Sequence, residues 1–209
     1  MVRIKLSRIQ WGVIKTAVFI LCLLPFMAIS WDAVNNLLGP DPIQALHVRT
    51  GDWTLRFLLI TLTMSPLQRL LKTPVPIRFR RMLGLFTFFY ASTHMMVWLV
   101  LDQSLSLDNM LQDIPESPYI ILGLTAYSLL IPLAITSTAG MMRRLGRRWT
   151  VLHRTVYLIA VFGVIHFFWL TKLDYQEPLI YSLILGVLLA FRWRILKAIF
   201  TPKSAISKT

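Results

Sequence analysis

Six long stretches of apolar residues alternate with short polar segments along this chain. The apolar stretches cover residues 11–31, 53–70, 82–101, 119–138, 149–170 and 178–196. Each has close to the roughly 20 residues that an α-helix needs to cross the hydrocarbon layer of a membrane, at about 1.5 Å per residue. The pattern therefore predicts an all-α, multi-pass membrane protein, in which residues 1–209 form one transmembrane domain of six helices.

The charged residues between these stretches indicate how the helices are oriented. Basic residues gather in segments 3–15, 69–81, 143–154 and 192–208, which fall on one side of the membrane when the loops alternate. All nine acidic residues fall on the other side, where only Arg49, Arg56 and Lys172 join them. Because short loops rich in Lys and Arg stay in the cytoplasm, we expect both termini to be cytoplasmic.

The composition excludes several classes of function. Hydrophobic residues make up 56% of the 209 residues and the mean hydropathy is +0.64, which is typical of a protein embedded in membrane lipid. The net charge of +13 comes from short clusters between apolar stretches, so we expect no nucleic-acid partner. Cys22 is the only cysteine, which rules out an intrachain disulfide and a cysteine-ligated iron–sulfur cluster. No loop exceeds about twenty residues, so we expect any soluble catalytic domain to belong to a partner.

Breaker residues mark the expected boundaries between helices. The segment 32–50 contains Asn-Asn, Gly-Pro and Asp-Pro, which predict an external loop with a solvated His47. Pro132 is expected to break the fourth helix with a kink. Residues 28–30, Ala-Ile-Ser, loosely resemble a signal-peptidase site. We expect an uncleaved anchor instead, because the first apolar run is long and its loss would leave an odd number of spans.

Two histidines in the apolar stretches are candidate ligands of one haem. His94 and His166 lie about fifteen and sixteen residues beyond the basic ends of the third and fifth helices, so both imidazoles reach a similar depth in the outer half of the membrane. Two imidazoles at one depth suit the axial positions of a haem b, whose apolar ring would fill the space between helices. Zinc or copper would need a further ligand, which is not evident at this depth. A simple hydrogen-bonded pair of histidines is the other alternative.

A second haem is an open alternative at the inner end, where His153 lies. The matching position on the third helix holds Arg81 and Met82 and no histidine, so Met82 is the candidate second ligand. On an ideal helix His153 and His166 point roughly 140° apart. The sequence therefore predicts either a distortion of this helix, near Gly163, or different neighbours for the two histidines.

Basic residues at the inner ends of the third and fifth helices are candidate anion ligands. They could bind haem propionates, a flavin phosphate or an acidic partner. Alternatively, they serve only to orient the protein in the membrane, as basic residues in cytoplasmic loops do. These arginines are Arg78, Arg80, Arg81, Arg143, Arg144, Arg147 and Arg148.

Three segments together resemble a known family. They are His94 with its helix, RTGDWTLRFLLITLTMSPL at residues 49–67, and TSTAGMMRRLGRRWTVLHRTVYLIAVFGVIHFFW at residues 136–169. This pattern is similar to the haem-binding membrane subunits, MsrQ or YedZ, of bacterial methionine-sulfoxide reductase systems. That family belongs to the ferric-reductase-like transmembrane domains, whose members include the NADPH oxidases and STEAP proteins.

The resemblance implies a role in electron transfer across the bacterial inner membrane. Such subunits take electrons from the quinone pool or from a cytoplasmic flavin reductase. They pass them through haem b to the periplasmic molybdenum enzyme MsrP, which repairs oxidised proteins, and the family is also described as binding FMN. The acidic outer segment 102–116 would then be a docking surface for MsrP. The alternatives are a related cytochrome b of a ferric or cupric reductase, and a haem-free transporter that uses intramembrane histidines.

Overall fold

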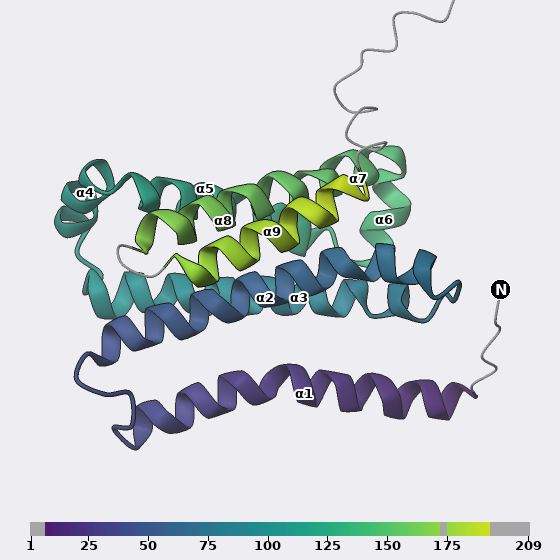
Figure 1. Ribbon diagram of the computed structural model, residues 1–209, viewed down its shortest axis with the longest axis horizontal. Helices are drawn as coiled ribbons and strands as arrows, with labels where there is room; N and C mark the ends of the chain where they lie inside the picture. The colour runs from purple at the N-terminus through teal and green to yellow at the C-terminus, as the bar shows by residue number, and fades with distance from the viewer. Residues whose placement is uncertain (1–6, 172–174, 193–209) are drawn as a thin grey trace, which may run out of the picture.

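The computed structural model describes residues 7–171 and 175–192, and within them all regular structure is helical, as the apolar pattern predicts. The long helices run side by side along one axis (Figure 1). In chain order the elements are α1 (Arg8–Val34), α2 (Pro42–Leu70), η1 (Pro76–Arg78), α3 (Arg80–Met96), η2 (Val97–Asp102), α4 (Leu107–Glu116), α5 (Pro118–Ile135), α6 (Ala139–Leu145), α7 (Arg147–Leu152), η3 (His153–Thr155), α8 (Val156–Leu170) and α9 (Gln176–Ala190).

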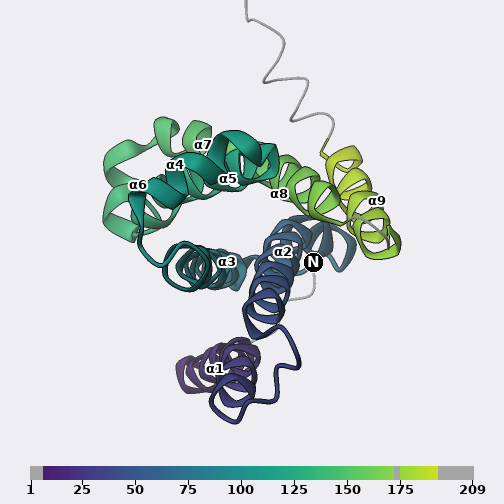
Figure 2. The ribbon, with the colours of Figure 1, turned by 90° about the vertical axis from the view of Figure 1, so that its left-hand side faces the viewer.

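Four helices, α2, α3, α5 and α8, surround the centre of the molecule, with α1 outside α2 and α3 and with α9 outside α8 (Figure 2). The main core joins apolar side chains of α2, α5, α8 and α9, among them Leu62, Leu133, Ala160 and Leu188. Close packing of this kind holds membrane helices together, because lipid is as apolar as the side chains that it would replace.

An aromatic cluster attaches α1 to this bundle. Tyr90 of α3 is 0% exposed, and its ring stacks on Phe57 of α2 at 5.1 Å between centroids. Its hydroxyl donates to the backbone oxygen of Cys22 at 2.8 Å and accepts from the backbone N–H of Phe26 at 3.0 Å. The hydroxyl thus takes the place of a helical hydrogen bond beside Pro25, which satisfies both backbone groups in an apolar environment.

Among the described residues, four helices are long and apolar enough to cross a membrane: α1, α3 with η2, α5, and α7 through α8. The second expected span lies in α2, which has 29 residues but carries charges such as Arg49, Asp52 and Arg56. The sixth lies in α9, a shorter apolar helix, and residues 193–196 of that expected span are outside the described residues.

The external loop predicted for residues 32–50 was largely wrong. Helix α1 continues to Val34, and α2 begins at Pro42, so His47 lies on a helix and not in a loop. Asp41 caps α2, because its side chain accepts a hydrogen bond from the backbone N–H of Gln44 at 3.0 Å. Pro42 occupies the first helical position, where a missing N–H costs nothing. The Asp-Pro pair is therefore a helix start.

Two expectations about helix continuity also need correction. Pro132 lies inside α5, which continues to Ile135 and is not broken there. The expected fifth helix is interrupted by the 3-10 turn η3 at His153–Thr155, between α7 and α8, so the distortion is not at Gly163. A tighter turn changes the rotation between residues on either side of it, which removes the fixed angle of an ideal helix between His153 and His166.

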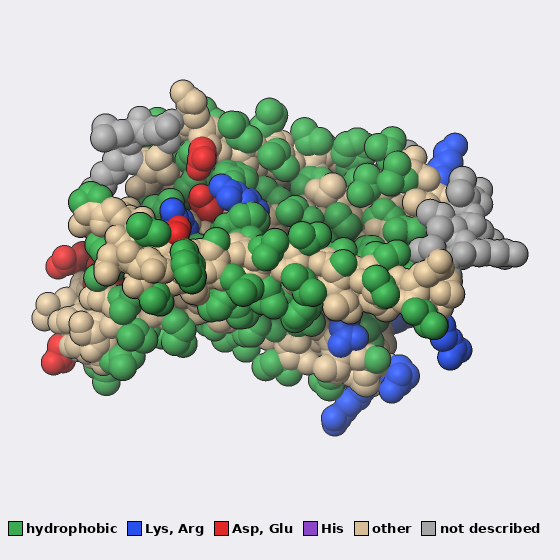
Figure 3. Space-filling view, turned by 90° about the horizontal axis from the view of Figure 1, so that it is seen from below, with side chains coloured by type: hydrophobic (Ala, Val, Ile, Leu, Met, Phe, Trp, Pro, Cys, Tyr) green, Lys and Arg blue, Asp and Glu red, His purple; other side chains and the backbone are tan. Residues whose placement is uncertain are grey.

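Opposite charges gather at the two ends of the molecule, called here the acidic end and the basic end (Figure 3). The predicted acidic loop contains the amphipathic helix α4, which is tied down by its own polar contacts. Asp113 accepts hydrogen bonds from Nε2 of Gln103 at 2.8 Å and from Oγ of Ser117 at 3.1 Å. The separation of charge predicted from the sequence is therefore present in three dimensions.

Candidate functional site

A cavity of about 550 Å³ lies between α2, α3, η2, α5 and α8 and opens toward the acidic end. Its deeper wall is apolar and includes Leu58, Leu130 and Ile159, whereas Gln44 and His47 line its outer part. This volume is within the range of about 300 to 1,000 Å³ that ligand and cofactor sites occupy. The charges and histidines around it therefore identify it as the candidate site.

His94 of α3 and His166 of α8 both line this cavity, although they are 72 positions apart in the chain. Their ring centroids are 6.2 Å apart and the ring planes are nearly perpendicular, at 84°. The structure thus brings together the two histidines that the sequence places at one depth.

Hydrogen bonds at Nδ1 fix the orientation of both imidazoles. Nδ1 of His166 is 2.7 Å from the backbone oxygen of Tyr119, and Nδ1 of His94 is 3.1 Å from that of His47. A carbonyl oxygen can only accept, so the hydrogen of each neutral ring is on Nδ1. Oγ1 of Thr50, also 3.1 Å from Nδ1 of His94, donates its own hydrogen to Leu46 and so also accepts. Each Nε2 is left with a free lone pair, as metal-binding histidines require.

A glycine on the neighbouring helix makes room for each of these rings. A Cβ atom on Gly51 of α2 would lie 3.2 Å from Cε1 of His94. A Cβ atom on Gly123 of α5 would lie 3.0 Å from Cε1 of His166. Each imidazole therefore packs directly on backbone, in a space that a larger residue would fill.

These features fit a haem held between two imidazoles. His94 and His166 would hold the haem iron through Nε2, whose lone pair is free on each ring. Both rings line the same cavity, and their centroids are 6.2 Å apart. No group of three or more His, Cys, Asp or Glu that could hold a metal ion is found in the described part of the chain. The donor set is thus better suited to an iron that already has four porphyrin nitrogens than to zinc or copper.

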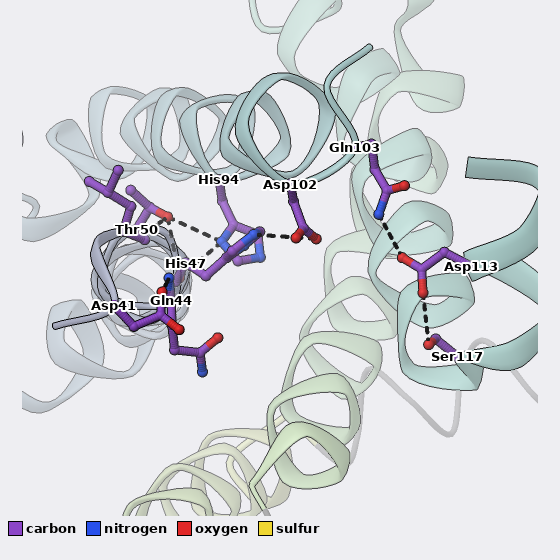
Figure 4. Close-up of polar contacts among 10 residues, drawn as sticks. Asp41, Gln44, His47, Thr50, His94, Asp102, Gln103, Asp113 and Ser117 are labelled. Atoms are coloured by element: carbon purple, nitrogen blue, oxygen red, sulfur yellow. Dashed lines mark hydrogen bonds and ion pairs between the residues drawn. The ribbon is translucent and has the colours of Figure 1, made fainter. Parts of the chain in front are cut away.

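His47 forms the outer wall of the cavity beside His94 (Figure 4). The two rings are 5.5 Å apart between centroids, and Nε2 of His47 is 3.8 Å from Oδ2 of Asp102. Burial lowers the pKa of His47, and the nearby Asp102 carboxylate opposes that shift. Asp102 and Trp98 come from η2, a π-helix, an element that often occurs at functional sites.

His153 lies outside the residues that line the cavity. Its Nε2 is 2.9 Å from Oγ1 of Thr136, and its ring stacks on Trp149 at 4.0 Å between centroids. Met82 packs against the aromatic cluster between α1, α2 and α3. The structure therefore gives His153 and Met82 different sets of neighbours.

The candidate arginines also lie away from the cavity lining. Arg78 stacks over the ring of Trp11 at 4.3 Å, Arg80 is partly buried, and Arg81 is exposed. The remaining four are exposed on α6 and α7, on either side of the turn at Gly146: Arg143, Arg144, Arg147 and Arg148.

Sequence reasoning misses several residues at or near this site. Gly51 and Gly123 carry no signal in the sequence, because only their contact with an imidazole on another helix distinguishes them from other helical glycines. Trp98 resembles the aromatic belt residues that most membrane proteins have. Away from the cavity lining, Arg192 lies in a basic segment that the sequence explains by orientation alone, yet it is 4% exposed and donates to the backbone oxygen of Leu62 at 2.9 Å.

Comparisons with known proteins agree with a haem-binding membrane protein. Residues 50–164 match the family described as ferric reductase like transmembrane component. Three of the most similar relatives are proteins named protein-methionine-sulfoxide reductase heme-binding subunit MsrQ. The one from Herminiimonas arsenicoxydans is 46% identical over 88% of this chain and 85% of its own length. The one from Xanthomonas campestris pv. campestris strain B100 is 47% identical over 88% of both chains, and that of Bordetella parapertussis is 44% identical over 88% and 92%. No solved structure matches the chain significantly.

Proposed function

Since this chain belongs to the ferric-reductase-like transmembrane family and, within it, to the MsrQ subunits, we propose that it is a haem b electron carrier of a methionine-sulfoxide reductase system. The relatives are named as heme-binding subunits, and the cavity between His94 and His166 suits that role. Catalytic reduction of methionine sulfoxide takes place in the partner enzyme.

The single observation that supports this function best is the pair of free Nε2 atoms on His94 and His166. Their rings are 6.2 Å apart, and both are oriented by hydrogen bonds to backbone oxygens. In this proposal His94 and His166 would hold the haem iron. When bound, the haem accepts and releases one electron at a time. The protein orients the haem, excludes water from most of it and sets its potential through the apolar wall.

The proposed topology has six spans within one domain, in the bacterial inner membrane, with the basic end and both termini in the cytoplasm. Basic residues concentrate at one end of the bundle, as they do on the cytoplasmic side of membrane proteins. The haem cavity, which opens toward the acidic end, would then face the periplasm. Electrons would leave there for the periplasmic molybdenum enzyme MsrP, with the acidic segment around α4 as its docking surface.

The electron source in this proposal is the quinone pool or a cytoplasmic flavin reductase. His153, at the basic end, is assigned to a quinone site or to a second haem, for which Met82 is the candidate second ligand. The arginines of the basic end are assigned to the propionates of such a haem, to an FMN phosphate or to an acidic partner. Among these arginines Arg80 is the best candidate, because it is partly buried and its charge acts on His153.

The test is the reduced-minus-oxidised absorption spectrum of the full chain purified in detergent from cells with ample haem. We expect a b-type spectrum that is lost in His94→Ala and in His166→Ala, because either change removes one axial ligand. His153→Ala is expected to alter the spectrum without abolishing it, because His153 does not line the cavity between His94 and His166.

Two outcomes would contradict the proposal. A wild-type protein without haem absorbance would exclude the cytochrome function and favour a haem-free transporter. Full haem content in both the His94 and the His166 variants would remove these residues from the site. A second assay distinguishes the proposed function from that of a related ferric or cupric reductase. Membranes that contain this protein with its haem reduced are mixed with MsrP and methionine sulfoxide. Reoxidation that requires both additions supports the proposed partner.

A further inference from the structure

The carboxylates that line the haem cavity all lie at one end of it. Its deep part, toward the basic end, is lined by side chains such as Leu58, Leu130 and Ile159. Its mouth at the acidic end is lined by Gln44, His47 and Trp98 together with carboxylates. Because a buried carboxylate among aliphatic side chains is strongly unfavourable, an amphiphilic ligand has only one stable orientation in this cavity.

Two nitrogen atoms at this mouth are buried without a hydrogen-bond partner among the described residues: Nε1 of Trp98 and Nε2 of His47. The indole N–H can only donate, and Nε2 of His47 donates when it carries the hydrogen of the ring. An unpaired buried N–H is costly, so most such groups in proteins have an acceptor. Both residues line the cavity, which indicates that the missing acceptor belongs to its ligand.

Two of the three carboxylates at the mouth, Asp41 and Asp52, already have donor partners. Asp41 accepts from the N–H of Gln44, and Asp52 pairs with Arg56 at 3.2 Å. Asp102 lies 3.8 Å from Nε2 of His47, and its side chain is 46% exposed (Figure 4). Asp41 is exposed as well, so water reaches this end of the cavity. A further anionic group at the mouth can therefore be solvated, which the aliphatic end does not allow.

We propose that the two propionates of the haem lie at this outer mouth, with the indole N–H of Trp98 and Nε2 of His47 as their hydrogen-bond donors. This inference rests on the proposed haem function and adds the direction in which the haem is inserted. The arginines of the basic end, at the far side of the aliphatic wall, are then not the propionate ligands of this haem. The π-helix η2 positions Trp98 for this contact.

The experiment is a binding cycle with two ligands and two proteins, the wild type and one variant, together with a control variant. The full-length apoprotein, in detergent, is titrated with haem and with haem dimethyl ester, whose carboxyl groups carry no charge. The same titrations are made with Trp98→Phe, which keeps a ring of similar shape but removes the N–H. Trp31→Phe is the matched control, because Trp31 is exposed on α1 and is not part of the cavity lining.

We expect Trp98→Phe to weaken haem binding by about tenfold, the effect of one lost hydrogen bond to a charged group. The same substitution is expected to change binding of the ester by less than about twofold, because neutralising the acceptor removes most of that bond. In the resonance Raman spectrum of the haem-loaded protein, the propionate bending mode should shift in Trp98→Phe and stay constant in Trp31→Phe.

An equal loss for haem and for its ester would overturn the inference, since Trp98 would then act through packing alone. An unchanged propionate mode in Trp98→Phe would overturn it as well. In both cases wild-type protein still binds haem and the proposed function stands. If the wild type binds neither ligand, the proposed function itself fails.

Discussion

Cε1 of His166 lies 3.0 Å from the position that a Cβ atom would take on Gly123, on the neighbouring helix α5. Real Cβ atoms rarely come so close to another atom, so the ring occupies the place of the missing side chain. Gly51 and His94 repeat the arrangement at 3.2 Å. The distance between the two imidazoles therefore depends on two glycines, which have no side chain.

Gly123→Ala should displace His166 and weaken haem binding. Forcing one extra methyl group into a packed site costs about 1 to 3 kcal/mol, which corresponds to a loss of affinity of about fivefold or more. Haem titration of the purified apoprotein measures this loss. Gly186→Ala is the control, because a Cβ atom added there would meet no atom within 4 Å. Equal affinities for both variants would mean that the ring of His166 does not need this space.

Tyr90→Phe should loosen α1 from the bundle without affecting haem binding. The substitution removes a hydroxyl that bonds Cys22 and Phe26 beside Pro25. A hydrogen bond of this kind contributes about 1 kcal/mol, so the midpoint of thermal unfolding in detergent should fall by about 2 to 4 °C. An unchanged midpoint would show that the backbone N–H of Phe26 and the backbone oxygen of Cys22 form a direct hydrogen bond in the variant.

Asp41→Ala should fray the first turns of α2, where His47 lies. The lost cap costs about 1 kcal/mol, and Asn in the same position should keep most of the stability because it is also a good cap. Hydrogen exchange of the backbone amides of residues 44–48 reports this difference. Faster exchange in Asp41→Asn than in Asp41→Ala would contradict the assignment of Asp41 as a cap.

Asp52→Asn should destabilise the protein more than the double change with Arg56→Gln. Arg56 pairs with Asp52 at 3.2 Å and donates to the hydroxyl of Tyr181 at 2.9 Å. The single change leaves a partly buried cation without its counter-charge, and the double change removes both charges. Because the pair is partly exposed, we expect a difference of only about 2 to 4 °C in the unfolding midpoint. A lower midpoint for the double variant would show that the amide alone satisfies Arg56.

The sequence alone determined the properties that are local in the chain. Apolar length identifies helices, so the all-helical architecture could be predicted from the order of residues. The separation of basic and acidic segments and the matched depth of His94 and His166 were also visible, because depth is a count of residues along one helix.

Only the tertiary structure decided which helix faces meet. The rotation of a helix about its own axis depends on packing against other helices, and a one-dimensional pattern with little amphipathic contrast does not record it. That rotation brings the ring centroids of His94 and His166 to 6.2 Å, places Gly51 and Gly123 against them, and makes Trp98 part of the cavity lining. The 3-10 turn at His153 and the helical start at Asp41 were missed for a related reason. An Asp-Pro pair occurs in turns as well as at helix starts, and contacts with distant residues select one of these conformations.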